Sequence, residues 1–313
     1  MLSRTADSLF WLARYVERAE NVARTVTVAH RMESVGRSLG SSGNEWLSTI
    51  IATGCESGFF AKYPEANPAE VIDYLVRDPD NPSSIVSCLE TARRNARAVR
   101  TALTADMWEA LNATWLGARE RRALNGADGL MDFLEWIRER SQLFAGSYAS
   151  TMLRNDAFYF TRLGTFLERA DNTARILDVK YYVLLPQDEG VGGALDYYQW
   201  QSILRSVSAL RAYHWVYHDR LQPWLIAELL LLRREMPRSL LSCYDQITRY
   251  LDLIAEAYGG ERGECHRLAG EAHARLRYGK IQKIFQSGLH EFLTDFIDRS
   301  ILLGGEISNL YLV

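Results

Sequence analysis

Apolar residues recur every three to four positions along most of the chain, whereas the alternating pattern typical of β-strands is almost absent. The sequence therefore predicts helices joined by short loops. The first helix is expected over residues 3–35, and the glycine-rich stretch 36–44 ends it. Further helices are expected over 46–60, 68–77, 84–105, 106–124 and 129–149. Pro79 and Pro82 break the chain before Ser84, which is a suitable N-cap for the helix that follows.

One short charged stretch occurs twice. Residues 17–24 read ERAENVAR and residues 168–175 read ERADNTAR, so the copies differ at only two positions. Other segments recur in the same order, such as PSSIVSC at 82–88 and PRSLLSC at 237–243. The spacing between matching segments rises from 151 to 159 residues along the chain, as small loop insertions would cause.

The order of these matches predicts an all-α fold, built by tandem duplication of a six-helix unit and packed as a pseudo-two-fold helical bundle. The first helical unit is expected over residues 1–150 and the second over 151–313. No linker rich in proline, glycine or serine separates them near Ser150, so we expect two units packed together, or one compact domain. Residues 186–194 are the expected counterpart of the glycine-rich loop after the first helix.

The composition is that of a globular protein and gives no sign of nucleic-acid binding or of a membrane span. Apolar content of 48% and charged content of 24% are ordinary for a soluble globular chain. The net charge of −3 gives no basic footprint for nucleic acid. The most apolar run, 225–232, contains Glu228 and is too short to span a bilayer. Because the first turns carry Arg4, Asp7 and Arg14, the start lacks the apolar core of a signal peptide. We therefore expect a cytoplasmic protein that binds neither nucleic acid nor membrane.

Polar positions that both copies keep need a reason beyond burial, because the copies have diverged elsewhere. The shared set contains Glu17/Glu168, Arg18/Arg169, Glu20/Asp171, Asn21/Asn172, Arg24/Arg175, Arg94/Arg249, Asp132/Glu291 and Arg140/Arg299. At about 100° per residue, Glu17, Asn21 and Arg24 form one stripe of the first helix, and Arg18 points away from it. Gly164 lies one turn before Glu168, where a small residue lets another helix or a ligand approach the carboxylate.

Two explanations remain open for Glu17 and Glu168, the candidate catalytic residues. Each can form a structural ion pair with an arginine of another helix, because a buried carboxylate must be paired to stay charged. The first candidates for these partners are Arg94, Arg140, Arg249 and Arg299. In the second explanation, carboxylates and arginines form a pocket near the pseudo-two-fold axis that binds a metal, or a ligand bearing an amine or a carboxylate.

The candidate binding residues are Arg18, Asn21, Arg24, Arg169, Asn172, Arg175, Arg94 and Arg249. Within this set, Arg24 is expected to pair with Glu20, and Arg175 with Asp171. Such i,i+4 pairs are worth about 0.2–0.5 kcal/mol each.

The chain carries no clear signal for a metal or a cofactor, and neither is predicted. No glutamate is followed three positions later by histidine, as a ferritin-like di-metal site would require. His214 and His218 are i,i+4 neighbours, but two histidines without a placed carboxylate are a weak signal. The glycine patterns that bind nucleotide phosphates are missing. Cys88 and Cys243 lie in apolar runs with no histidine nearby in the sequence to activate a thiol, so they are expected to be core residues.

Two segments are candidate docking surfaces. Residues 92–100 carry four arginines, of which only Arg94 recurs in the second unit, at Arg249. They form either a solvated face or a dock for an acidic partner. The segment 197–224 is rich in tyrosine and tryptophan, which often mark an interface when they are exposed.

The doubled Glu-Arg motif, the MLSR start and the NPSSIVSC block together resemble the alpha-E family, predicted all-helical bacterial proteins named for this signature. The likeness covers nearly the whole chain. Family members are typically encoded beside circularly permuted ATP-grasp proteins and transglutaminase-like proteins. The resemblance therefore implies a supporting role in peptide or amide-bond chemistry. The family's Glu-Arg positions correspond to Glu17, Arg18, Glu168 and Arg169.

The first hypothesis is a helical accessory or scaffold protein that acts with an ATP-grasp-type ligase or a transglutaminase-like protein. The alternative is an enzyme, or a protein that binds a small molecule or a metal, with the Glu/Arg pocket as its site. An open cleft around Glu17 and Glu168 without arginine partners favours the alternative. Closure of each carboxylate by an arginine of another helix favours the scaffold. The sequence leaves open whether the chain forms a homo-oligomer.

Overall fold

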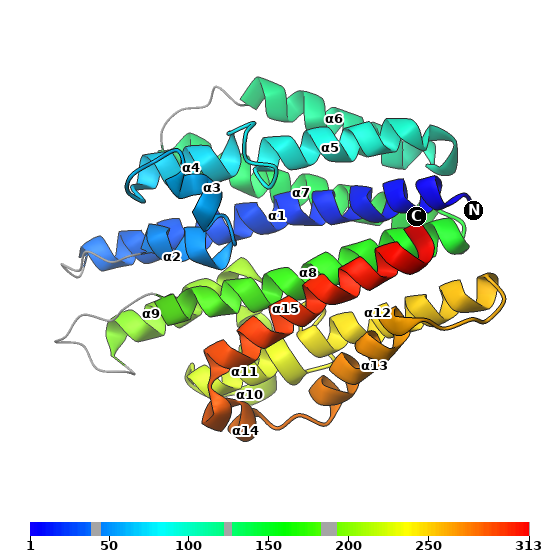
Figure 1. Cartoon of the computed structure of the whole chain (residues 1–313). Helices are drawn as coiled ribbons and strands as arrows, with labels where there is room; N and C mark the ends of the chain where they lie inside the picture. Colours follow the sequence, from blue (N-terminus) through cyan, green and yellow to red (C-terminus); the bar gives the residue numbers. More distant parts are fainter. Residues whose placement is uncertain (39–44, 122–126, 183–192, 313) are drawn as a thin grey trace.

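A computed structural model describes residues 1–38, 45–121, 127–182 and 193–312. Over these ranges the chain is helical and contains no strand, which confirms the all-α class (Figure 1). The first half contains α1 (Ser3–Ser38), α2 (Glu45–Ala52), α3 (Glu56–Phe60), α4 (Pro68–Val76), α5 (Ile85–Ala98), α6 (Ala105–Arg121) and α7 (Ala127–Thr151). The second contains α8 (Asp156–Tyr182), α9 (Ala194–Ser206), α10 (Leu210–Tyr217), α11 (Pro223–Leu232), α12 (Leu240–Ala257), α13 (Glu264–Arg277), α14 (Ile281–Ser287) and α15 (Leu289–Ile307).

The helix predicted over 46–60 is wrong as a single element, because α2 and α3 share that segment. Gly54 lies between them with a φ of +70°, a left-handed conformation that ends a helix. The predicted helix over 84–105 is also shorter, since α5 ends at Ala98 and a 3₁₀ turn follows. These breaks put seven α-helices in the described part of the first half, in place of the six predicted.

Capping explains where the helix after the proline break starts. Ser84 is the N-cap of α5, as predicted, and its hydroxyl accepts a hydrogen bond from the backbone N–H of Ser87 at 3.2 Å. Ser239 caps α12 in the same way, through the N–H of Ser242 at 3.0 Å. The expected loops at 36–44 and 186–194 lie mostly outside the described residues.

Two long helices form the centre of the molecule. α1 and α8 lie side by side and run in the same direction, although they come from different halves of the chain (Figure 1). α5 packs against α1, and α12 packs against α8. The larger apolar cluster draws residues from Ala6 to Leu312, so both halves share it. None of the helices in the described ranges combines the length and the apolar character needed to cross a bilayer.

A glycine, Gly164, allows α1 and α8 to pack tightly at one point of their contact. A Cβ atom added at Gly164 would lie 2.3 Å from the backbone carbonyl oxygen of Phe10. Such a contact is too short for any real Cβ, and a backbone atom inside a buried helix cannot move away cheaply. The prediction that a small residue at 164 admits another helix is therefore confirmed.

We expect Gly164→Ala to destabilise the protein by about 1–3 kcal/mol, because the two central helices must separate to admit the methyl group. Gly146→Ala in α7 is the matched control, since nothing lies within 4 Å of its added Cβ. The control should be neutral or stabilise the helix by up to about 1 kcal/mol. Urea denaturation of both variants measures the two changes. Equal stability of Gly164→Ala and wild type would show that the helices are not in tight contact there.

Candidate functional site

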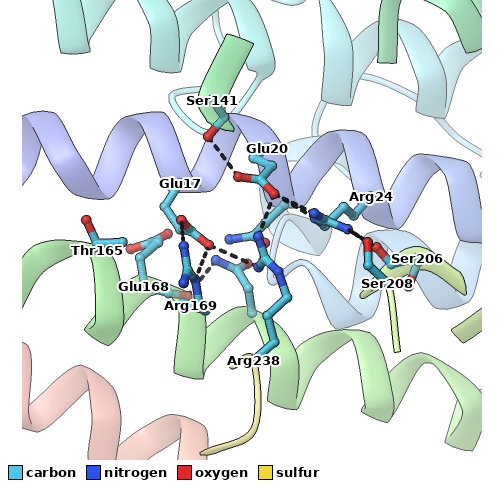
Figure 2. A network of polar contacts seen from close by, with 12 residues as sticks. Glu17, Glu20, Arg24, Ser141, Thr165, Glu168, Arg169, Ser206, Ser208 and Arg238 are labelled. Atoms are coloured by element: carbon cyan, nitrogen blue, oxygen red, sulfur yellow. Dashed lines mark hydrogen bonds and ion pairs between the residues drawn. The ribbon is translucent and has the colours of Figure 1, made fainter. Parts of the chain in front are cut away.

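The two copies of the Glu-Arg motif face each other across the contact between α1 and α8. Arg169 donates two hydrogen bonds to Glu17, from Nε to Oε1 and from Nη2 to Oε2, each 2.9 Å long (Figure 2). Arg18 donates to Glu168 in the same manner, at 2.6 Å from Nε and 3.1 Å from Nη2. Each motif thus supplies the glutamate for the other motif's arginine, in the bidentate geometry that suits a guanidinium and a carboxylate.

Helix geometry makes this crossed pairing possible. Glu17 and Arg18 are consecutive residues of α1, so their side chains leave the helix about 100° apart. The same holds for Glu168 and Arg169 of α8. Because the two helices are parallel and adjacent, each glutamate meets the arginine at the same height on its neighbour. Both motif arginines therefore lie at the contact between the helices. For Arg18 the angles within the first helix alone do not predict this, because they place Arg18 away from the stripe of Glu17.

On the Glu17 side a second arginine, Arg238, enters from the loop before α12. Arg238 donates from Nη1 to Oε1 of Glu17 at 3.0 Å, and from Nη2 to Oε1 of Glu20 at 2.5 Å (Figure 2). Arg24 also donates to Glu20, and the hydroxyl of Ser141 donates to its second oxygen at 2.8 Å. Burial favours protonation of Glu20, but Arg238 and Arg24 outweigh it and hold the pKa of this carboxyl well below its ordinary value.

On the Glu168 side the second arginine is Arg14, which comes from α1. Its Nε donates to Oε2 of Glu168 at 2.8 Å. Burial acts to raise the pKa of Glu168, but Arg18 and Arg14 together lower that pKa to about 2. This side is not closed. A cavity of about 240 Å³ opens beside it, and its walls include Arg14, Arg18, Thr53, Ser83, Glu168, Asp171, Asn172, Arg175 and Ile301.

The structure confirms that Glu17 and Glu168 are buried, at 4% and 2% exposed, and that arginines bind both. The predicted partners are wrong. Arg94 and Arg249 lie on exposed faces of α5 and α12, away from the two glutamates. Arg140 donates to Thr114 and to the carbonyl of Ala110, and Arg299 pairs with Asp295 and Glu271. These arginines are bound within their own half, whereas the motif arginines lie directly across the helix contact.

Both predicted i,i+4 ion pairs are present. Arg24 Nη2 lies 2.6 Å from Glu20, and Arg175 Nε lies 2.7 Å from Asp171. Each arginine also donates to a backbone carbonyl at a helix end, Arg24 to that of Ser206 and Arg175 to that of Ala52. Arg24 thereby ties α1 to α9, and Arg175 ties α8 to α2.

The two candidate asparagines are placed differently. Asn21 is buried, and its side-chain oxygen accepts from Arg238 Nη1 at 3.4 Å. Asn172 donates from Nδ2 to the backbone carbonyl of Glu168 at 2.7 Å and lines the cavity.

Sequence reasoning missed Arg14 and Arg238. Arg14 lies one turn before Arg18 and shares its helix face, so periodicity could have found it. Arg238 matches Ser83 in the first copy, at a spacing of 155 residues. It was not among the candidates because these were limited to polar positions that keep the same residue type in both copies.

The two matched cysteines are core residues, as predicted. Cys88 and Cys243 are fully buried, and burial raises the pKa of each thiol to about 12. Across residues 1–38, 45–121, 127–182 and 193–312, no three or more His, Cys, Asp or Glu side chains come together as a metal-binding group.

The fold and the site define an all-helical protein whose two central helices are joined by paired Glu-Arg motifs. A family model described as a predicted alpha-helical domain with a conserved ER motif, Alpha-E, matches residues 1–312. The chain belongs to the Alpha-E family. The paired residues of the two ER motifs here are Glu17 with Arg169 and Glu168 with Arg18.

Curated relatives occur in mycobacteria. Uncharacterized proteins of Mycobacterium bovis and Mycobacterium tuberculosis are each 23% identical to this chain over 319 residues, and the match covers 94% of it. The chain spans about a third of the length of these relatives, since the match covers 35% of each. No solved structure matches the chain.

The low pKa of Glu168 predicts a specific dependence of stability on pH. Because the pKa in the folded state, about 2, lies below the ordinary value of 4.5, the carboxylate stabilises the fold fully above about pH 5. That contribution, on the order of 3 kcal/mol, is lost progressively as the pH falls through 4.5 toward 2. Urea denaturation of wild type and Glu168→Gln at pH 7, 5, 4 and 3 measures it. The difference in unfolding free energy should shrink below pH 5, and a difference independent of pH would contradict the assignment.

Proposed function

We propose that this chain is a helical scaffold or accessory protein that acts with an ATP-grasp-type ligase, or with a transglutaminase-like protein, in peptide or amide-bond chemistry. The observation that carries the proposal is that an arginine of the neighbouring helix pairs with each motif glutamate. Every carboxylate oxygen of Glu17 and Glu168 already accepts a hydrogen bond from a guanidinium. The conserved signature therefore serves to join helices.

The same geometry argues against Glu168 as a general acid or base. A catalytic carboxyl works best when its pKa lies near the working pH. The pKa of Glu168 is held at about 2 by Arg18 and Arg14, so the group stays ionised and paired at neutral pH. Glu17 is bound by Arg169 and Arg238, which leaves neither oxygen free for a substrate.

The length of the relatives supports action with a partner. In the mycobacterial proteins the matching region is about a third of one polypeptide, so it is covalently attached to further chain there. We infer that the further chain of those relatives is a partner of this unit, and that the unit binds such a partner through a surface.

Duplication of one helical unit is our proposal for the origin of the fold. It is supported by the matched caps Ser84 and Ser239, by Pro68 and Pro223 at the first position of α4 and α11, and by the reciprocal Glu-Arg pairs. In this proposal the two units pack about a pseudo-two-fold axis that runs between α1 and α8.

The face formed by the arginines of residues 92–100 is the proposed docking surface for an acidic region of the partner. Arg94, Arg97 and Arg100 are exposed along it. Arg93 lies against the ring of Trp115, with Cζ 4.1 Å from the ring centre, and Arg100 lies against Trp108 at 5.4 Å. Arginines held over aromatic rings present their charge with little loss of conformational freedom. A second candidate docking surface is aromatic and includes Trp215, which is 81% exposed, and Trp224, which is 48% exposed.

Charge reversal tests this surface. The tagged chain is used to capture proteins from an extract of its native host, and mass spectrometry is expected to identify an ATP-grasp-type ligase. With that ligase purified, Arg97→Glu/Arg100→Glu should weaken binding at least about tenfold, because like charges then oppose each other across the interface. Circular dichroism should show an unchanged fold. Arg4→Glu, at an exposed site on α1, is the control for loss of positive charge.

Two results would contradict the proposal. The first is turnover of ATP by the isolated chain, since a scaffold supplies no such chemistry. The second is recovery of no ligase or transglutaminase-like partner at native protein levels.

A further inference from the structure

The cavity beside Glu168 exists because the two sides of the motif pair are filled differently. On the Glu17 side, the side chain of Arg238 occupies the space between Glu17 and Glu20. The residue that matches it 155 positions earlier is Ser83, which lines the cavity on the Glu168 side. A serine is several atoms shorter than an arginine, so the corresponding space is left open. Its volume of about 240 Å³ is far larger than the roughly 10–15 Å³ that one water molecule requires.

The charges around the cavity decide what kind of ligand suits it. Its walls carry three arginines, Arg14, Arg18 and Arg175, and only two carboxylates, Glu168 and Asp171. The cavity therefore has one positive charge in excess before any ligand enters. A cation in the place that Arg238 takes on the other side would raise this excess to two, which is unfavourable in a partly buried site.

The hydrogen-bond donors point to the same ligand class. Both oxygens of Glu168 accept from Arg18 or Arg14, and both oxygens of Asp171 accept from Arg175. The carboxylates are thus fully bound. By contrast, Nη1 and Nη2 of Arg14 and Nη1 of Arg18 make no hydrogen bond within the described chain. These nitrogens are available to an acceptor.

Arg14 and Arg18 are also held in place before a ligand arrives. Each is anchored to Glu168 through Nε, and the guanidinium of Arg14 stacks on Trp11 with Cζ 4.5 Å from the ring centre. Their side chains are 15% and 22% exposed, so solvent and small solutes reach them. Fixed arginines with free terminal nitrogens are the usual means by which proteins bind carboxylate and phosphate groups.

We propose that this cavity is a binding site for a small anion, recognised through a carboxylate or phosphate group by Arg14 and Arg18. The site lies apart from the arginine face proposed for partner docking, so it does not depend on that proposal. Ile301, which is 59% exposed, lies at the cavity wall on α15.

Calorimetric titration of the full chain tests the site, with succinate, inorganic phosphate and ethylguanidinium as probes at constant ionic strength. One succinate or one phosphate per chain should bind, and ethylguanidinium should not. Preference for succinate assigns the natural ligand a carboxylate, and preference for phosphate assigns it a phosphoryl group. Absence of binding by both anions, or tighter binding of ethylguanidinium, would overturn the proposal.

Variants locate the binding. Arg14→Gln should weaken anion binding at least about tenfold, because it removes the main free donors and one charge. Ile301→Glu places a negative charge at the cavity wall and should weaken binding to a similar degree. Leu302→Glu adds the same charge at the adjacent exposed residue, which does not line the cavity, and should leave binding nearly unchanged.

The two exposed positions on α15 keep the test decisive if Arg14→Gln proves unstable. Equal affinities of Ile301→Glu and Leu302→Glu would place the anion elsewhere and reject the site.

Discussion

Two buried glutamates on adjacent helices set the packing of this protein. Neither Glu17 nor Glu168 can remain charged in the core without a guanidinium, and the motif arginine that pairs with each comes from the other helix. Buried ion pairs are weak evidence for stability, because desolvation offsets much of their attraction. Their value here is that they fix the register of the two helices, because sliding α1 along α8 by one residue would break all four hydrogen bonds of the two bidentate pairs at once. The contact at Gly164 requires the same alignment.

Different residues bind the glutamates of the two copies of the motif in addition to the motif arginines. The Glu17 side receives Arg238 and is packed shut, whereas the Glu168 side receives Arg14 from α1 and keeps a cavity. A structural ion pair on one side and a solvent-accessible arginine site on the other can therefore derive from one sequence signature. Burial of a conserved charged motif does not decide whether its neighbourhood is structural or functional. Here the difference comes from the residues added around each copy, which are Arg238 on the Glu17 side and Arg14 with Ser83 on the Glu168 side.

Local patterns predicted much of this structure. Periodicity located most helices of the first half, and Pro68 and Ser84 marked the starts of α4 and α5. The break at Gly54 was missed because a single glycine within an apolar run does not reveal its φ angle. The glutamates were correctly expected to be buried and paired, since an unpaired buried charge is costly. Their partners were not found, because pairing depends on which helices are neighbours and in which direction they run, and neither follows from the periodicity of one helix.

The most direct test of the crossed pairing is a pair of double-mutant cycles measured by urea denaturation. In the first, Glu17→Gln and Arg169→Met are combined, and the account predicts that the single variants lose about 3–5 kcal/mol while the double variant loses much less than their sum. In the second, Glu17→Gln is combined with Arg18→Met, its neighbour on the same helix, and the coupling should be clearly smaller than in the first cycle, because Arg18 donates to Glu168 and not to Glu17. Coupling of Glu17 to Arg18 as strong as its coupling to Arg169, or none to Arg169, would contradict the claim that the two motifs hold each other across the helix contact.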